Sequence, residues 1–268
     1  MFRRKEAQGL RVFNTIFFLL MVAVNIYAEV IPLNKVTTAE ISAQHDTMLT
    51  PPGFTFVIWG IIYTWLLLFI LFQNGLFLKK GVGDNPDIVH AVSAFFIISS
   101  AANIGWIIAW HYDYIILCFA LIFTLWVVLL FAYLRLKKEV RTFRESFLAQ
   151  APFSAYLAWI SIAMTINFMG MLKQSAPNLA GISETAWTIV IIIGLFLFVE
   201  FILFRYRDFV FALTAVWAFF GIFYRYFDKL KTESMPTDML LLLSIVMAVL
   251  FISLLLTAWM QHYKPNMT

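Results

Sequence analysis

The segment YIILCFALIFTLWVVLLFAYL, residues 114–134, contains 21 consecutive residues without a charged side chain. A helix rises 1.5 Å per residue, so about 20 apolar residues cross the roughly 30 Å of hydrocarbon in a bilayer. This segment is therefore long enough to span a membrane. Seven other apolar runs have comparable lengths, at about 11–31, 53–78, 88–110, 147–172, 186–204, 209–227 and 238–261. The sequence predicts an all-α, polytopic integral membrane protein with about eight transmembrane helices.

The composition excludes the main alternatives to a membrane protein. Of the 268 residues, 62% are apolar and 13% are charged, against roughly 45–50% and about 25% in soluble domains. These fractions rule out a water-soluble globular fold, and the hydrophobicity rules out intrinsic disorder. Eleven glycines and a single cysteine, Cys118, exclude a fibrous or disulfide-stapled fold. The net charge of +4 gives no indication of nucleic acid binding, and we expect none.

The distribution of basic residues supports eight crossings. With the N-terminus inside, 14 of the 19 Lys and Arg residues lie on the inner side, and the five outer ones are Lys35, Lys173, Arg225, Lys229 and Lys231. Because basic residues concentrate on the cytoplasmic side, we expect both termini in the cytoplasm. The first run is expected to be a retained span, and the membrane to be a bacterial cytoplasmic membrane. Residues 206–208 alone separate the sixth and seventh runs, which fits either a tight turn or a re-entrant pair.

Signatures of soluble enzymes are absent from the sequence, including a phosphate-binding glycine loop, H-E-x-x-H and C-x-x-C. Charged residues within spans are the default functional candidates, because charge in hydrocarbon is costly. Glu200, near the inner end of the sixth run, fits either an ion pair with Arg205 or Arg207, or a proton-coupling carboxylate. His45 and His111 fit either a metal or haem site or ordinary loop positions, and we expect no metal site.

Polar and aromatic residues deep in the apolar runs fall on shared helical faces. Trp59 and Tyr63 lie four residues apart in the second run, and Asn103 and Trp106 lie three apart in the third. A face of the fifth run carries Tyr156, Trp159, Ala163 and Asn167. Amides in hydrocarbon need hydrogen-bond partners within the bundle, so we expect these faces to turn inward around an uncharged aromatic cavity. Such a cavity fits a flat apolar ligand better than an ion.

Three blocks of sequence resemble the tryptophan-rich sensory proteins, the translocator protein (peripheral benzodiazepine receptor) family. PPGFTFVIWGIIY, residues 51–63, resembles the family pattern P-P-x-W/F-x-F-x-x-W-x-x-x-Y. NIGW, residues 103–106, resembles the N-x-x-W of the family's third helix, and PFSAYLAWISIAMTIN, residues 152–167, resembles its fifth. The resemblance covers about residues 8–173, so it implies a five-helix bundle over residues 1–173, and residues 174–268 add three further transmembrane helices.

The resemblance also implies a function. Family members bind tetrapyrroles such as protoporphyrin and haem in a cavity of the bundle, and some bind sterols or aromatic drugs. The ligand-binding residues implied here are Phe56, Trp59, Tyr63, Asn103, Trp106, Tyr156, Trp159, Ala163 and Asn167. Some bacterial members promote light-dependent porphyrin breakdown, and Trp59 and Trp159 match the tryptophans involved. No cofactor is required, and a bound porphyrin or haem is the expected ligand.

Two departures from the family pattern affect the expected ligand. The loop before the double proline, residues 43–49, lacks the family's aromatic pair and Lys-Pro, and that loop covers the pocket in the family. Residues 167–170 offer no tyrosine, which disfavours sterol binding.

Two other functions stay open, namely a secondary transporter that depends on Glu200 and a non-catalytic subunit that binds a protein partner. The small residues from Ser99 to Gly105 permit close helix approach, either within the bundle or between the protomers of a homodimer.

Overall fold

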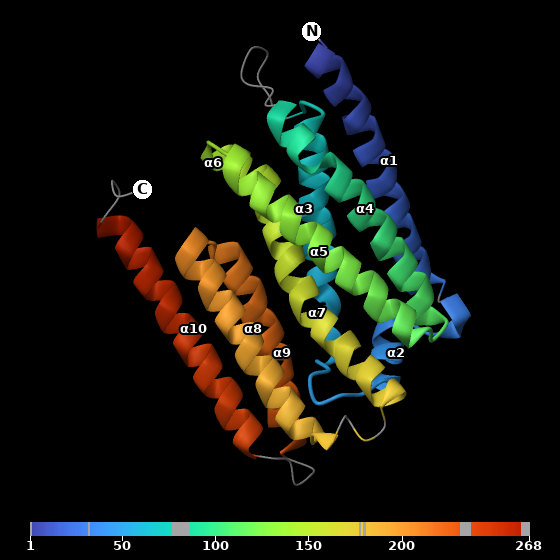
Figure 1. Ribbon diagram of the computed structural model, residues 1–268, viewed down its shortest axis with the longest axis vertical. Helices are drawn as coiled ribbons and strands as arrows, with labels where there is room; N and C mark the ends of the chain where they lie inside the picture. The colour runs from blue at the N-terminus through green and yellow to red at the C-terminus, as the bar shows by residue number, and fades with distance from the viewer. Residues whose placement is uncertain are drawn as a thin grey trace.

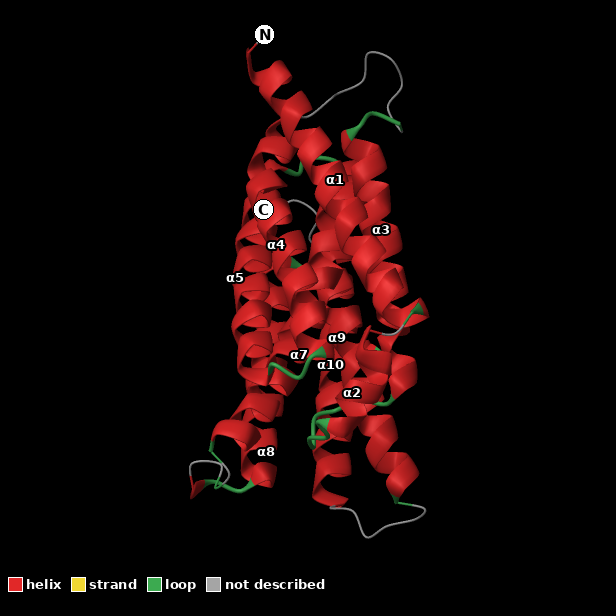
Figure 2. Cartoon of the chain, turned by 90° about the vertical axis from the view of Figure 1, so that its right-hand side faces the viewer, coloured by secondary structure: helices red, strands yellow, loops and turns green. Residues whose placement is uncertain are grey.

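A computed structural model describes residues 2–31, 33–76, 86–176, 178, 181–230 and 237–263, without the side chains of 2–5 and 263. Within these residues eight helices are long and apolar enough to cross a membrane. Their main helices are α1 (Phe2–Val30), α3 (Ile58–Gln73), α4 (Pro86–His111), α5 (Ile115–Glu139), α7 (Ala151–Ser175), α8 (Glu184–Tyr206), α9 (Phe209–Lys229) and α10 (Thr237–Tyr263). Two of the spans also include the short helical segments that lead into α3 and α7, so they cover Gly53–Gln73 and Phe143–Ser175. The all-α, eight-span prediction is confirmed (Figures 1 and 2).

Short helical segments connect several of the long helices. They are η1 (Leu33–Lys35), α2 (Thr38–Gln44), η2 (Gly53–Val57), α6 (Phe143–Glu145) and the π-helical turn η3 (Ser146–Gln150). Thr37 and Glu40 form a capping box that starts α2, and the same hydrogen bonds hold the pKa of the Glu40 carboxyl below its ordinary value. The capping box therefore fixes where α2 begins.

The helices form two groups that meet at α7 (Figure 1). In the first group α4 packs between α1 and α5, α5 packs on α7, and α3 packs on α1 and α7. In the second group α9 packs on α8 and α10, and it is also the main contact of this group with α7. Every residue from 151 to 162 is buried as a result. The division of the chain after residue 173 stays a prediction.

The turn between α8 and α9 is tight, and both helices are full-length spans rather than a re-entrant pair. Arg207 adopts a left-handed conformation there, with φ 51° and ψ 43°. The two described ends of the chain lie toward the same end of the bundle (Figure 1), as an even number of crossings requires. The orientation of this bundle in the membrane stays a prediction from the charge distribution.

Asp208, in the same turn, ties the two helical groups together. Its Oδ1 accepts hydrogen bonds from the Ser154 hydroxyl at 2.8 Å and from the Phe211 backbone N–H at 3.0 Å. Its Oδ2 accepts the Tyr133 hydroxyl at 3.0 Å and pairs with Lys137 Nζ at 3.0 Å. Burial raises the Asp208 pKa, but Lys137 and the hydrogen-bond donors outweigh it and hold this pKa below its ordinary value. The turn is thereby fastened to α5 and α7.

Small residues let α4 pack closely on α5. A Cβ atom added at Gly105 would come 3.3 Å from the side chain of Leu121 in α5. Gly105 therefore serves the packing of these two helices within the bundle, which is one of the two uses that the sequence suggested for this segment.

Candidate functional site

A chain of hydrogen bonds crosses the middle of the first helical group. The Asn25 amide donates to Asn103 Oδ1 at 2.7 Å, which joins α1 to α4. The Asn103 amide in turn donates to the Tyr156 hydroxyl at 2.9 Å and to the Tyr63 hydroxyl at 3.5 Å. Asn103 and Tyr156 are fully buried. Four helices therefore satisfy one another's polar groups at this level, as uncharged polar groups within a membrane require.

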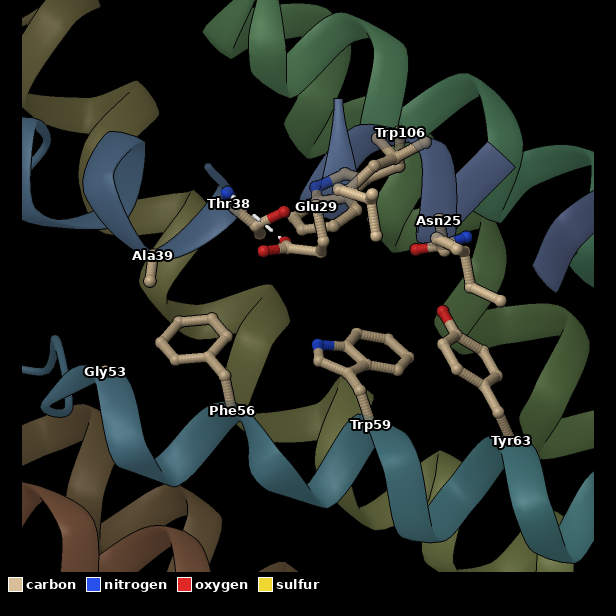
Figure 3. Close-up of a pocket in the computed structure, with 12 residues that line it drawn as sticks. Asn25, Glu29, Thr38, Ala39, Gly53, Phe56, Trp59, Tyr63 and Trp106 are labelled. Atoms are coloured by element: carbon tan, nitrogen blue, oxygen red, sulfur yellow. Dashed lines mark hydrogen bonds between the residues drawn. The ribbon is translucent and has the colours of Figure 1, made fainter. Parts of the chain in front are cut away.

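A cavity of about 390 Å³ lies beside this chain, between α1, α2, η2, α3 and α4. Phe56, Trp59 and Tyr63 form one wall and face Asn25 and Glu29 across it (Figure 3). The other lining residues are Ile26, Val30, Thr38, Ala39, Gly53, Trp106 and Ile107.

The Trp59 and Tyr63 rings in this wall stack, with centroids 5.3 Å apart and planes 20° apart. At the opposite edge, Ile26 is 58% exposed and Val30 is 72% exposed, so the cavity is open along α1. Its volume falls in the usual range of small-molecule pockets, about 300–1,000 Å³.

A second, smaller space of about 30 Å³ lies behind Trp59 and shares Phe56, Trp59 and Trp106 with the cavity. Its far side is formed by α7, including Trp159, Ala163 and Asn167. The Trp59 and Trp159 rings meet edge to face with centroids 6.2 Å apart. Trp106 Nε1 donates to Asn167 Oδ1 at 3.0 Å, which fixes its ring between the two spaces.

A family model described as TSPO-like protein matches residues 11–259 of the sequence. The chain belongs to the TSPO-like family. The resemblance predicted from the three motifs is confirmed, and the match continues beyond residue 173 through α8, α9 and most of α10. Membership identifies an integral membrane protein of the receptor or sensor type. No curated protein and no solved structure matches the chain.

The predicted site residues of this TSPO-like protein occupy three kinds of position. Phe56, Trp59, Tyr63 and Trp106 line the cavity. Trp159, Ala163 and Asn167 line the smaller space, which Phe56, Trp59 and Trp106 separate from the cavity. Asn103 and Tyr156 line neither space and act through the hydrogen bonds that position Asn25 and Tyr63. Their roles in ligand binding stay predictions.

Two polar residues of α1 were missed by the sequence reasoning. Asn25 and Glu29 lie one helical turn apart and both line the cavity (Figure 3). The cavity was expected to be uncharged, but Glu29 faces it, and its Oε1 accepts the Thr38 backbone N–H at 3.3 Å. The spacing of four between Asn25 and Glu29 is the signal that could have found them.

The lid segment, residues 46–55, closes the end of the cavity near α2, and α9 holds it. Arg225 pairs with Asp46 and donates to the carbonyls of Thr47 at 2.8 Å and Thr50 at 2.7 Å. The Trp217 indole donates to the Thr55 carbonyl at 3.0 Å. Two side chains of α9 therefore fix the conformation of the lid segment in this TSPO-like chain.

Helix α8 holds the same segment from its first turn. Glu184 Oε1 accepts the Met48 backbone N–H at 3.0 Å, and Glu184 Oε2 pairs with Lys173 at 3.1 Å. Lys173 also donates to the Asp46 carbonyl at 3.0 Å. The lid segment is thereby anchored to α7, α8 and α9 together.

The other ionisable candidates differ in their surroundings. Glu200 makes no ion pair with Arg205 or Arg207 within the described residues, so that interpretation is wrong; both oxygens of its carboxylate are buried and have no hydrogen-bond partner there. His45 pairs with Asp113 at 2.6 Å.

The ring of His111 bonds the Ile107 carbonyl at 2.8 Å through Nδ1. Across the described ranges, no group of three His, Cys, Asp or Glu side chains is arranged to hold a metal ion.

Proposed function

We propose that this TSPO-like protein binds a flat, largely apolar ligand in the cavity between α1, α2, α3 and α4, with a tetrapyrrole as the first candidate. The observation that carries the proposal is the aromatic wall of Phe56, Trp59 and Tyr63 facing Asn25 across about 390 Å³. The rings supply a broad apolar surface for stacking, and the amide and hydroxyl groups supply orientation. Family membership supports the same class of ligand.

The charges around the cavity favour one orientation and one kind of tetrapyrrole. Glu29 is acidic, and none of the other lining residues that the structure describes is charged. The carboxylates of a porphyrin would therefore lie away from Glu29. Among the described residues lining the cavity, none is histidine, cysteine or methionine, and the one tyrosine, Tyr63, already accepts a hydrogen bond from Asn103 at its hydroxyl. Metal-free protoporphyrin is therefore favoured over haem.

A Trp59→Phe substitution is expected to weaken protoporphyrin binding about five- to tenfold, because the smaller ring loses part of the stacking wall, about 1 kcal/mol. The measurement is a spectral titration of the purified protein in detergent micelles. Trp259→Phe is the matched control, since Trp259 lies on α10 and is 58% exposed. A titration that shows no bound spectrum, or equal affinities for the two variants, would contradict the proposal.

Light-dependent breakdown of the bound porphyrin is a second candidate function. The edge-to-face contact of Trp59 and Trp159 favours it, because two oxidisable indoles lie 6.2 Å apart with Trp59 in the cavity wall. Trp159 is 3% exposed, and its indole nitrogen has no hydrogen-bond partner among the described residues.

Trp159→Phe is expected to slow the bleaching of bound protoporphyrin severalfold under illumination in air, while affinity changes less than in Trp59→Phe. The reason is that Trp159 lines only the smaller space behind Trp59. The loss of porphyrin absorbance with time is the measurement, with Trp187→Phe as the control at a span end. Bleaching at the wild-type rate in Trp159→Phe would rule out this role.

A further inference from the structure

A basic hollow of about 630 Å³ lies far from the cavity, between the last turn of α5 and the last turn of α8. Four of its six lining residues are cationic, namely Lys137, Lys138, Arg205 and Arg207, and the others are Leu134 and Tyr206. Asp208 pairs with Lys137 and can neutralise one of the four charges. The hollow therefore keeps a net positive charge, which favours the binding of an anion.

The backbone presents Arg207 to the hollow in a costly conformation. Its φ of 51° lies in the left-handed region, which costs an L-residue other than Asn or Asp about 1 kcal/mol and which glycine adopts freely. A glycine at position 207 would adopt this turn conformation without the backbone strain. The chain carries an arginine instead, and its guanidinium lines the hollow.

The hollow lies where a membrane places its phosphate groups. It is formed at the ends of two spanning helices, because α5 ends at Glu139 and α8 at Tyr206. Large apolar side chains one to two turns away along the same helices are exposed, with Phe131 at 52% and Phe201 at 56%. In a bilayer those rings contact acyl chains while the cations meet the headgroup layer.

We propose that this hollow binds the phosphate group of an anionic membrane phospholipid. The guanidinium groups of Arg205 and Arg207 offer paired N–H donors that match phosphate oxygens, and Lys138 adds a third charge. Lys137 is held by Asp208 and the Tyr206 carbonyl and forms the floor of the site. Since this floor is also the attachment of the α8–α9 turn to α5, a bound headgroup stabilises the junction of the two helical groups.

The test compares the thermal unfolding of the full chain in nanodiscs of phosphatidylcholine with nanodiscs that also contain phosphatidylglycerol. For the wild type, phosphatidylglycerol is expected to raise the midpoint by several degrees, because a ligand that binds only the folded state stabilises it. Arg207→Gly is expected to be at least as stable as the wild type in phosphatidylcholine, since glycine relieves the backbone strain. It is nevertheless expected to need about tenfold more phosphatidylglycerol for the same shift.

Two further experiments test whether the shift comes from this site and from a lipid. The double variant Lys138→Gln/Arg207→Gln should lose the shift, whereas Arg141→Gln/Arg144→Gln, which removes two exposed charges outside the hollow, should keep it. Equal shifts in these two double variants would overturn the site and indicate a general surface-charge effect. Inorganic phosphate added in phosphatidylcholine alone should give no shift; the full, Arg207-dependent shift with phosphate would overturn the assignment to a lipid.

Discussion

An Asp208→Ala substitution is expected to lower the free energy of unfolding by about 3–5 kcal/mol. Asp208 is 4% exposed and its carboxylate pairs with Lys137, whose side chain is itself only 16% exposed. Removing the carboxylate leaves that ammonium without its counter-charge and also leaves the hydroxyls of Tyr133 and Ser154 without their acceptor. The measurement is equilibrium unfolding of the purified protein in mixed micelles.

Three companion variants separate the loss of the Asp208 charge from the loss of its hydrogen bonds. Asp208→Asn keeps an acceptor for Ser154 but loses the charge, so its free energy of unfolding should lie between those of the wild type and Asp208→Ala. The double variant Lys137→Met/Asp208→Asn removes both charges. It should recover much of the stability lost in Asp208→Ala, because neutral groups can often replace a buried ion pair. Asp238→Ala, at the exposed first turn of α10, should cost less than about 1 kcal/mol. Equal losses in Asp208→Ala and Asp238→Ala would contradict the buried-pair interpretation.

The pH dependence of this effect follows from the direction of the Asp208 pKa shift. The folded-state pKa lies below the ordinary value of 3.8, so the unfolded chain binds the proton more readily. The stabilisation is therefore fully present above pH 3.8 and is lost only as the pH falls through the lower folded-state pKa. The difference between the wild type and Asp208→Ala should stay constant from pH 5 to 8 and shrink below that range.

The spans and part of the cavity could be predicted from the sequence because their signals are local. Each apolar run is about long enough to cross the hydrocarbon of a bilayer, and the four-residue spacing of Trp59 and Tyr63 already places both rings on one face. The α2 segment, whose Thr38 and Ala39 line the cavity, gave no such signal.

Contacts between distant segments could not be predicted in the same way. Arg225 binds carbonyls of the lid segment that lie 175 and 178 residues away, and Asp208 appeared in the sequence as a residue of a short connection. Hydropathy and helical periodicity show which face of a helix is apolar, but they do not show which helix packs on it.

A Gly221→Ala substitution is expected to destabilise the protein, although alanine is normally the better helix former by about 1 kcal/mol. A Cβ atom at this position of α9 would lie 2.5 Å from Thr55 Oγ1 and 2.7 Å from Thr55 Cγ2. Thr55 is fully buried and β-branched, so its side chain has little freedom to move aside. Overpacking of this kind costs about 1–3 kcal/mol, and the displaced η2 segment carries Phe56 of the cavity wall.

The matched control for Gly221 is Gly194→Ala in α8, where an added Cβ has no neighbour within 4 Å. That variant should be neutral or up to about 1 kcal/mol more stable, so the two alanine substitutions are expected to have opposite signs. Thr55→Ala removes the two closest atoms and deletes a buried hydroxyl without a hydrogen-bond partner among the described residues. The double variant Gly221→Ala/Thr55→Ala should therefore recover most of the stability lost in Gly221→Ala.

The same pair of variants tests whether α9 controls the cavity through the lid segment. If contact between α9 and Thr55 positions η2, Gly221→Ala should weaken protoporphyrin binding together with stability, and Thr55→Ala added to it should restore both. The coupling between the two substitutions is the decisive quantity, because it cancels effects that each has alone. Additive free energies in the double variant would show that the close approach of Gly221 to Thr55 does not hold the lid segment in place.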